Sequence, residues 1–327
     1  MLLELLLGLA VLVFVAAVAS RRDLRKRALF AVLPVLLLLG AAELGARWVG
    51  DPGGLRPGGP LGWTARPGLT GLEVAAGSRH FEVSTNPDGL RTGLSRDRSA
   101  TPRWVIFGDS TVFGWGVAVE DAPAGTLERL VGDTEVLNAG QPGYSSEQAR
   151  RLAEQVIPAY RPDRVLWFHP WHDLAPATPD RDLLPPERGP LGALLARSAL
   201  LQRLRGVPGR TDNELFVFEP DRGGQGERVP AEHRRDNLER LARACRDIEA
   251  ELVLVLLPVN GGGRSGGLDE ELEQAAADLG AVFVDLNAQP SPRPWLEITV
   301  EGDPGHLNAA GNSLYMQRLL QALDAAG

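Results

Sequence analysis

Apolar and polar positions follow two different periods along the carboxy-terminal two thirds of the chain. Short apolar runs are typical of buried strands, and longer stretches with apolar residues three or four positions apart are typical of helices. The apolar runs lie at residues 104–107, 136–137, 165–168, 252–257 and 282–284. The helical stretches lie at residues 126–131, 146–160, 232–250, 268–279 and 308–323. Strands that alternate with helices predict an α/β fold, in which a parallel sheet of roughly five strands lies between two layers of helices.

Two apolar stretches near the amino terminus predict a hairpin of two transmembrane helices over residues 1–50. Residues 2–20 contain one charged residue, Glu4, and provide about the 20 residues that a helix needs to cross a bilayer. No basic residue precedes this stretch, which is unlike a signal peptide. Residues 28–49 form the second stretch, and membrane helices tolerate the proline within it. The alternative is a soluble protein with two buried helices, but such long spans without a polar face are rare in soluble domains.

The loop between the two apolar stretches predicts the orientation of the chain in the membrane. Residues 21–27 carry five positive charges and one negative charge, and basic loops of this kind stay in the cytoplasm. The amino terminus and everything after residue 50 are therefore expected on the outer side of the cytoplasmic membrane, which is the periplasm in a Gram-negative bacterium. The total net charge is −8, so the rest of the chain carries −12, which argues against nucleic acid as a partner.

Composition excludes several kinds of chemistry. Lys26 is the only lysine, so the body of the protein has no lysine nucleophile. Cys245 is the only cysteine, which excludes an internal disulfide and any Cys-x-x-Cys site. Its position in a helical stretch is more typical of a small core residue than of a reactive thiol.

Residues 51–100 predict a linker followed by a small irregular preface. The linker is rich in glycine and proline, residues 81–84 alternate like a short strand, and Asn86-Pro87-Asp88-Gly89 is a strong turn signal. The main domain is then expected at residues 101–327. It contains an irregular insertion at about 175–230, which we expect to form a lid or to shape a substrate site.

Candidate chemistry begins where the first strand of the main domain ends. Gly108-Asp109-Ser110-Thr111 breaks the apolar run with a turn, which places the Ser110 hydroxyl at the edge of the sheet, where open α/β sheets bind ligands. Ser110 is therefore a candidate nucleophile. The alternative is an ordinary turn in which Asp109 or Ser110 caps the next helix.

Three later segments supply what a nucleophilic serine needs. Asp303-Pro304-Gly305-His306 lies in a predicted loop before the last helix and offers a base with an orienting carboxylate. Residues 138–145 follow the second strand and contain two glycines, which let a backbone N–H approach a substrate oxygen closely. His172-Asp173 ends the third strand, where a side-chain N–H would be a further oxyanion donor.

With these four segments, residues 101–327 resemble the SGNH/GDSL hydrolases, serine esterases and acyl hydrolases with a flavodoxin-like three-layer αβα sandwich. The resemblance implies that Ser110 is the nucleophile and also gives its backbone N–H to the oxyanion hole. It implies that His306 is the general base, that Asp303 orients it, and that Gly143, rather than Gly140, is the second oxyanion donor. The apolar amino-terminal stretches, Asn-Pro-Asp-Gly-Leu-Arg at residues 86–91 and Gly-Asp-Ser-Thr-Val-Phe-Gly-Trp-Gly-Val at residues 108–117 resemble a membrane-tethered bacterial subgroup.

The third of these segments departs from the family pattern, because His172 occupies the position of an asparagine. An imidazole N–H can still donate to an oxyanion, at the cost of sensitivity to pH, because histidine titrates near neutrality. The alternative is a histidine with a structural hydrogen bond. A metal site of His169, His172, Asp173 and His306 is disfavoured, because residues three apart on a strand point to opposite faces. We expect neither a metal nor a cofactor.

The sequence therefore predicts a serine esterase that acts on an ester outside the cytoplasm, such as an O-acyl glycan or a lipid. Two alternatives remain open. One is an acyltransferase of the same fold, and the other is a catalytically silent SGNH-like domain that binds an envelope glycan or anchors an assembly. A nucleotide-binding protein is the least favoured, because no phosphate-cradling glycine loop follows the first strand.

Overall fold

The computed structural model describes residues 63–175, 226–258 and 267–326, together with Leu61, the short strand β1 (Leu55–Pro57) and a few helical positions between 38 and 44. The chain divides into two compact units, Met1–Pro52 with Gly189–Pro208, and Gly53–Arg188 with Gly209–Gly327. Nearly all described residues belong to the second unit. Within the described part of the chain, no helix is long and apolar enough to span a bilayer. The two predicted membrane stretches lie outside the described residues, apart from those few positions.

A five-stranded parallel sheet forms the centre of the second unit, as the sequence predicted. From edge to edge its strands are β6 (Glu135–Gly140), β5 (Arg103–Gly108), β7 (Arg164–Phe168), β8 (Glu251–Leu256) and β9 (Val282–Asp285). All four neighbouring pairs are parallel. The first of these strands along the chain lies between the second and the third, which is the flavodoxin-like order. The chain order reverses between β5 and β7, so a crevice for ligands is expected beyond their carboxyl ends.

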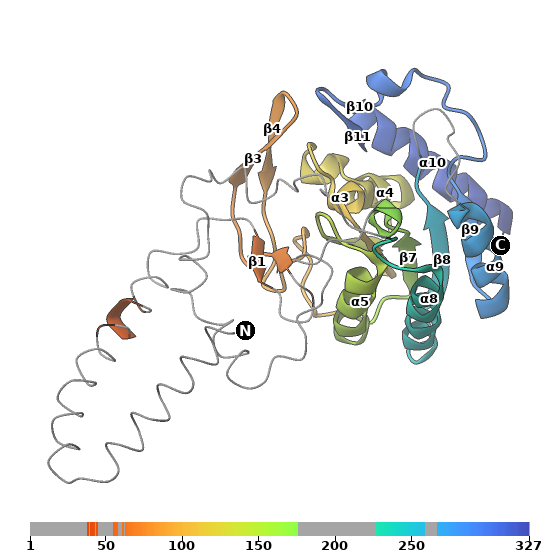
Figure 1. Ribbon diagram of the computed structural model, residues 1–327, viewed down its shortest axis with the longest axis horizontal. Helices are drawn as coiled ribbons and strands as arrows, with labels where there is room; N and C mark the ends of the chain where they lie inside the picture. The colour runs from red at the N-terminus through yellow and green to blue at the C-terminus, as the bar shows by residue number, and fades with distance from the viewer. Residues whose placement is uncertain are drawn as a thin grey trace, which may run out of the picture. The chain divides into compact units, whose positions relative to one another are not determined.

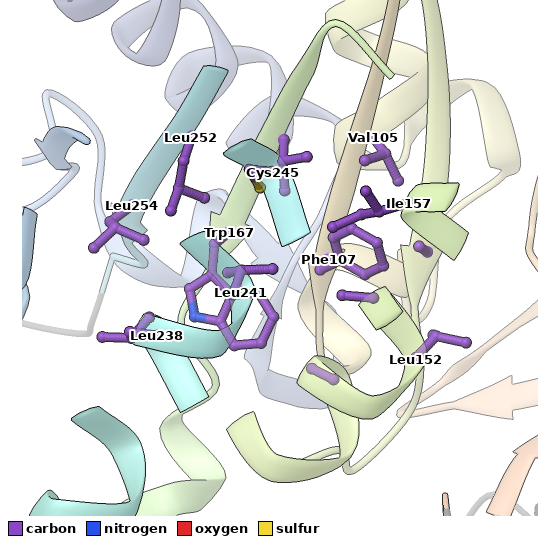
Figure 2. Packing of buried hydrophobic residues seen from close by; sticks show 14 of the residues in the cluster. Val105, Phe107, Leu152, Ile157, Trp167, Leu238, Leu241, Cys245, Leu252 and Leu254 are labelled. Atoms are coloured by element: carbon purple, nitrogen blue, oxygen red, sulfur yellow. The ribbon is translucent and has the colours of Figure 1, made fainter. Parts of the chain in front are cut away.

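Helices cover both faces of the sheet (Figure 1). One layer consists of α5 (Ser146–Tyr160), α8 (Ala231–Arg246) and α9 (Leu268–Leu279), and the other of α4 (Pro123–Val131) and α10 (Ala309–Ala326). Side chains of β5 alternate between the layers: Val105 and Phe107 pack with the first, and Ile106 with the second. Figure 2 shows Trp167 of β7 packed close to Leu241 of α8 in the first layer. The predicted three-layer arrangement follows directly from this alternation.

Local signals set the helix boundaries. Helix α5 begins with a capping box, in which the Ser145 side chain accepts from the Gln148 N–H and the Gln148 side chain accepts from the Ser145 N–H. The helix expected at residues 232–250 is shorter than predicted and ends at Arg246. The chain turns there because Glu249 adopts the left-handed conformation, with φ of 62°, and β8 starts two residues later.

The preface packs closely against the sheet and its helices. The hairpin of β3 (Leu72–Ala76) and β4 (Arg79–Val83) leads into the turn at Asn86, whose side chain accepts from two backbone N–H groups and donates to the Tyr160 hydroxyl of α5. Gln141, at the end of β6, accepts from the Ala65 N–H at 2.7 Å and donates to the Gly89 carbonyl at 3.1 Å. The Gln148 side chain of α5 likewise donates to the Leu61 carbonyl at 2.7 Å.

A second small hairpin carries the predicted base. The loop expected around His306 is in fact the short strand β11 (Asp303–Leu307), which pairs with β10 (Thr299–Val300) in an irregular antiparallel register. Asn308 then begins α10, because its side chain accepts from the N–H groups of Ala310 and Gly311. This hairpin brings the DPGH segment back toward the carboxyl end of β5.

Candidate active site

Three side chains from distant parts of the sequence meet beyond the end of β5. The His306 ring lies with Nε2 2.8 Å from the Ser110 Oγ and with Nδ1 2.9 Å from the Asp303 Oδ2. This is the geometry of a nucleophile, a base and an orienting carboxylate, each within hydrogen-bond reach of the next. The structure thus brings together the three residues that the sequence analysis selected.

The position of Ser110 follows from the turn that precedes it. A side chain at Gly108 would place its Cβ 2.5 Å from the Val112 Cγ2, so the turn needs glycine there. Asp109 accepts from the Thr111 N–H through its side chain and caps α3 (Ser110–Phe113). From the sequence, either Asp109 or Ser110 was a candidate cap of this helix, and the structure shows that Asp109 is the cap. Ser110 is the first residue of α3, so its backbone N–H has no acceptor within the helix.

Asp303 is held as a carboxylate by several donors. Burial by itself would raise the pKa of Asp303, but hydrogen bonds from His306, the Gly305 N–H and the Trp115 indole N–H lower it below the usual value. The negative charge next to the Nδ1 of His306 favours a proton on that nitrogen, which leaves Nε2 as an acceptor for the Ser110 hydroxyl. The pair therefore has the polarity that a general base requires.

The two glycines after β6 have different environments. Gly140 donates its N–H to the Asn138 Oδ1 at 3.0 Å, and a Cβ at this position would lie 2.3 Å from the Phe113 nitrogen, so Gly140 packs against α3. Gly143 sits in a turn with φ of 72°, closed by the Tyr144 N–H on the Gln141 carbonyl. Among the described residues nothing accepts from the Gly143 N–H. These environments favour Gly143 over Gly140 as a donor to a substrate.

His172 lies in a short 3-10 turn after β7 and faces the start of α3. Its Nε2 is 3.8 Å from the Asp109 Oδ2, and 37% of its side chain is exposed. Burial lowers the pKa of His172; the Asp109 carboxylate opposes this shift, and the Arg228 guanidinium adds to it. A lowered pKa favours the neutral imidazole, which has one N–H to donate.

His169 and Asp173 serve the packing of the same turn. Both side chains are fully buried, and the His169 Nε2 lies 3.1 Å from the Asp173 Oδ2. His169 accepts from the Trp167 indole at Nδ1, and Asp173 accepts from the Ser146 N–H at the start of α5. Within the part of the chain that the structure describes, no group of three His, Cys, Asp or Glu side chains could hold a metal ion.

Sequence similarity agrees with this geometry. The family model of the GDSL-like lipases and acylhydrolases matches residues 106–314, which is more than half of the chain. The chain belongs to the GDSL-like lipase/acylhydrolase family. The protein is accordingly an esterase or acylhydrolase that cleaves carboxylic esters, which confirms the resemblance inferred from its motifs at the level of the family.

Several solved structures are similar to this GDSL-like hydrolase at low identity. The psychrotrophic esterase EstA from Pseudoalteromonas sp., inhibited by monoethylphosphonate, is 16% identical with a TM-score of 0.42, over 68% of this chain and 97% of that one. The lipase/acylhydrolase from Enterococcus faecalis is 17% identical with a TM-score of 0.44, over 69% and 96%. Est24, a carbohydrate acetylesterase from Sinorhizobium meliloti, is 14% identical with a TM-score of 0.44, over 69% and 100%. No protein with a curated description matches the chain in sequence.

Sequence reasoning missed one residue at the mouth of the hydrolase site. Arg228 lies near the carboxy-terminal end of the predicted insertion, and its backbone N–H donates to the Ala175 carbonyl. Its guanidinium donates to the Gly143 carbonyl and to the Gln148 Oε1, both at 2.9 Å. Arg228 therefore ties the Gly143 turn to the segment that follows His172. No local pattern distinguishes this arginine from the other 32 in the chain, because the acceptors of its guanidinium lie 80 or more positions away.

Proposed function

We propose that this protein is a serine esterase that forms an acyl ester on Ser110 and acts on the outer side of the cytoplasmic membrane. The observation that supports the proposed catalytic roles is the pair of hydrogen bonds through His306, 2.8 Å to the Ser110 Oγ and 2.9 Å to the Asp303 Oδ2. The serine is 8% exposed, so it borders the protein surface without being immersed in solvent.

In the proposed mechanism, His306 takes the proton of the Ser110 hydroxyl as the oxygen attacks the ester carbonyl carbon. The tetrahedral intermediate then collapses, and His306 gives that proton to the departing alcohol, which leaves the acyl group on Ser110. Water attacks the acyl-enzyme with His306 again as the base, and the carboxylic acid leaves as the proton returns to the Ser110 oxygen. Asp303 stays ionised throughout and stabilises the imidazolium that forms twice in each cycle.

Three donors are proposed for the oxyanion. The N–H of Ser110, the N–H of Gly143 and the neutral ring of His172 come from the ends of three neighbouring strands. The Arg228 hydrogen bond to the Gly143 carbonyl supports this arrangement, because it fixes the turn that presents the glycine N–H. Fixed donors of this kind stabilise the developing negative charge without having to reorganise.

The substrate class and location rest on the sequence. Two apolar stretches around a basic loop favour a chain tethered to the membrane, with its hydrolase domain outside the cytoplasm. An ester on the cell envelope, such as an O-acyl group on a glycan or a lipid ester, would then be within reach. We expect the full-length protein in the membrane fraction after lysis without detergent, and recovery in the soluble fraction would refute the tether.

Experiments on the reaction at Ser110 distinguish the esterase from the two alternatives, an acyltransferase and a catalytically silent domain. A transferase would use the same acyl-enzyme but give the acyl group to an alcohol, so product analysis with and without an added alcohol acceptor distinguishes it from a hydrolase. The histidine at position 172 is the observation that favours a silent domain. A fluorophosphonate probe labels an activated serine, so a silent domain should remain unlabelled.

Replacement of the nucleophile tests the proposal most directly. We expect Ser110→Ala to abolish hydrolysis of p-nitrophenyl acetate by the full-length protein and to abolish fluorophosphonate labelling. Ser84→Ala is the matched control and should leave both unchanged, because the hydroxyl of this exposed serine accepts from the Gly71 N–H of the preface and has no other hydrogen bond among the described residues. Unchanged turnover in Ser110→Ala would refute the assignment of the nucleophile.

A further inference from the structure

The loop after α3 contains a tryptophan between two glycines, and both glycines are needed for its shape. Gly114 and Gly116 each have φ of 82°, a conformation that other residues rarely adopt. A Cβ at Gly114 would lie 2.4 Å from the Ala122 Cβ, and one at Gly116 would lie 2.7 Å from the Val300 Cγ2. The Gly-Trp-Gly sequence therefore lets the chain pass between two close neighbours with Trp115 at a fixed position.

Trp115 contacts both partners of the nucleophile. Its indole N–H donates to the Asp303 carboxylate, and its ring centroid lies 6.1 Å from that of His306, with an angle of 39° between the planes. The ring also makes an edge-to-face contact with Phe81 of the preface hairpin, with the ring centroids 5.4 Å apart and an angle of 66° between the planes. With 8% of its surface exposed, Trp115 fills the space between the preface and the His–Asp pair.

The fully buried Arg91 stabilises this loop through hydrogen bonds to backbone carbonyls. Arg91 donates to four backbone carbonyls, and no carboxylate contacts its guanidinium among the described residues. The four acceptors are the carbonyls of Phe113 at 2.9 Å, Gly114 at 2.7 Å, Val117 at 2.8 Å and Glu82 at 2.8 Å. Burial lowers the pKa of Arg91 to about 10, so the side chain remains a cation at neutral pH. Three of its acceptors lie in the segment that surrounds Trp115.

The turn at residues 86–91 explains how the arginine reaches this position. The Asn86 Oδ1 accepts from the N–H groups of Asp88 and Leu90, and Gly89 adopts φ of 81°. The tight turn sends Leu90 and Arg91 into the interior, where both side chains are fully buried. The Arg91 Nη1 lies only 3.0 Å from the place of a Gly114 Cβ, so the glycine also makes room for the guanidinium.

We propose that Trp115 is a positioning residue for the Asp303–His306 pair and that Arg91 of the preface fixes the loop that carries it. The indole N–H occupies one hydrogen-bonding direction of the Asp303 carboxylate, whose Oδ2 lies 2.9 Å from the His306 Nδ1. The indole ring limits the tilt of the imidazole toward Ser110. This inference rests on the proposed function of the three residues, and it joins the preface to the catalytic geometry.

The test compares two conservative tryptophan variants of the full-length protein with p-nitrophenyl acetate as substrate. Trp115→Phe keeps an aromatic ring but removes the N–H that donates to Asp303. We expect kcat to fall about tenfold with KM unchanged, which corresponds to the loss of about 1.4 kcal/mol in the transition state. Trp104→Phe is the control. Trp104 stacks on Arg164 at 4.4 Å near the opposite end of β5, so its replacement should leave kcat unchanged.

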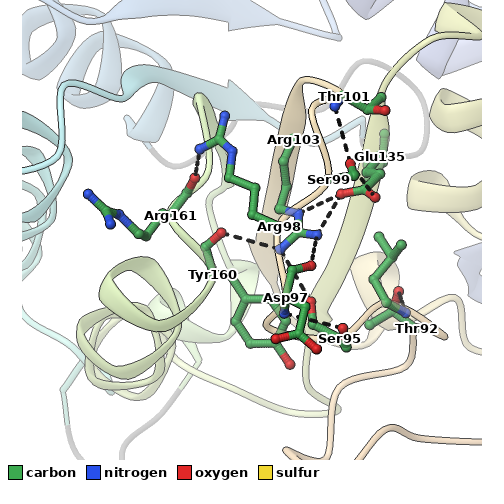
Figure 3. Close-up of polar contacts among 12 residues, drawn as sticks. Thr92, Ser95, Asp97, Arg98, Ser99, Thr101, Arg103, Glu135, Tyr160 and Arg161 are labelled. Atoms are coloured by element: carbon green, nitrogen blue, oxygen red, sulfur yellow. Dashed lines mark hydrogen bonds and ion pairs between the residues drawn. The ribbon is translucent and has the colours of Figure 1, made fainter.

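A pair of arginine variants tests the supporting role of Arg91. Arg103 is also buried, pairs with Glu135 and donates to the carbonyls of Ser95, Asp97 and Tyr160 at the amino-terminal end of β5 (Figure 3). Lysine has three donors on one atom and cannot reach the same set of carbonyls in either place. We expect both Arg91→Lys and Arg103→Lys to lower the urea midpoint of unfolding, but only Arg91→Lys to lower kcat, by about tenfold with KM unchanged.

The outcomes separate this inference from the proposed function. Activity that persists in Ser110→Ala would refute the proposed function itself. If Ser110→Ala is inactive and Trp115→Phe keeps the kcat of Trp104→Phe, the positioning role of Trp115 is refuted and the nucleophile stands. If Arg91→Lys loses stability but keeps kcat, the supporting role of Arg91 is refuted. Should Arg91→Lys fail to fold, Trp115→Phe still decides the role of the tryptophan.

Discussion

The charge of Asp303 can be removed with almost no change in shape, which makes its contribution to the rate predictable. In the wild type the His306 Nδ1 lies 2.9 Å from the Asp303 Oδ2, and in Asp303→Asn the amide oxygen can still accept from this nitrogen. Two unit charges about 4 Å apart attract by about 4 kcal/mol at the effective dielectric constant of about 20 found near protein surfaces. The side chains are 21% and 23% exposed, so solvent screening leaves roughly two thirds of this, or about 2.7 kcal/mol. Because the imidazolium forms only on the way to the transition state, we expect kcat to fall about 100-fold.

The assay is steady-state hydrolysis of p-nitrophenyl acetate by the full-length protein at pH 7.5, with kcat taken at saturation. KM should remain close to that of the wild type, because in the proposed mechanism this carboxylate acts on His306 and not on the ester. Asp278→Asn on the exposed side of α9 is the matched control and should leave kcat unchanged. A kcat for Asp303→Asn within threefold of the wild type, in protein with an unchanged unfolding midpoint, would refute the proposed role of the charge.

Two further predictions concern His172 and acid stability. If the ring of His172 donates to the oxyanion, His172→Ala should lower kcat about 100-fold, which is the typical effect of losing one such donor. His172→Asn retains an N–H, and its kcat should stay within a few-fold of the wild type. A normal kcat for His172→Ala would show that this residue is not part of the oxyanion hole. The hydrogen bond from Arg96 lowers the pKa of Asp88 below its value in the unfolded chain. The ionised carboxylate therefore stabilises the folded state fully above about pH 4, and this contribution is lost as the pH falls through the lower, folded-state pKa. Asp88→Asn should therefore cost up to about 1 kcal/mol at pH 7 and less as the pH falls through the folded-state pKa of Asp88. A difference between the melting temperatures of the variant and the wild type that does not shrink on acidification would contradict this.

The sheet and the three central side chains were predictable because each depends on local sequence. Apolar runs of strand length mark β5 and β7 without reference to any partner, and the parallel order places the ends of these strands at one edge. Ser110 and His306 each lie next to a break in an apolar pattern, which predicts that both residues are located at that edge. The family pattern then connected them, although the strand that carries His306 was expected to be a loop.

The supporting contacts were not predictable, because they depend on residues far apart in the sequence. Three of the four carbonyls that Arg91 binds lie 22 or more positions ahead of it, and carbonyls have no sequence signature. The partners of Arg228 are 80 and 85 positions behind it. The Gly-Trp-Gly segment was recognisable only as part of a motif, since the reason for each glycine is a neighbour from another part of the chain. Such contacts become visible only when the packed structure is known.

The contacts of the preface determine where a shortened catalytic fragment can begin. A fragment that starts at residue 101 would remove the acceptor or donor partners of the buried Gln141 and Gln148 side chains, which now bond to the backbone of Leu61, Ala65 and Gly89. Each unsatisfied buried polar group costs about 1–3 kcal/mol, a large share of the net stability of a domain. A fragment intended for crystallisation or enzymology should therefore begin before Leu61, although the α/β pattern in the sequence starts some forty residues later.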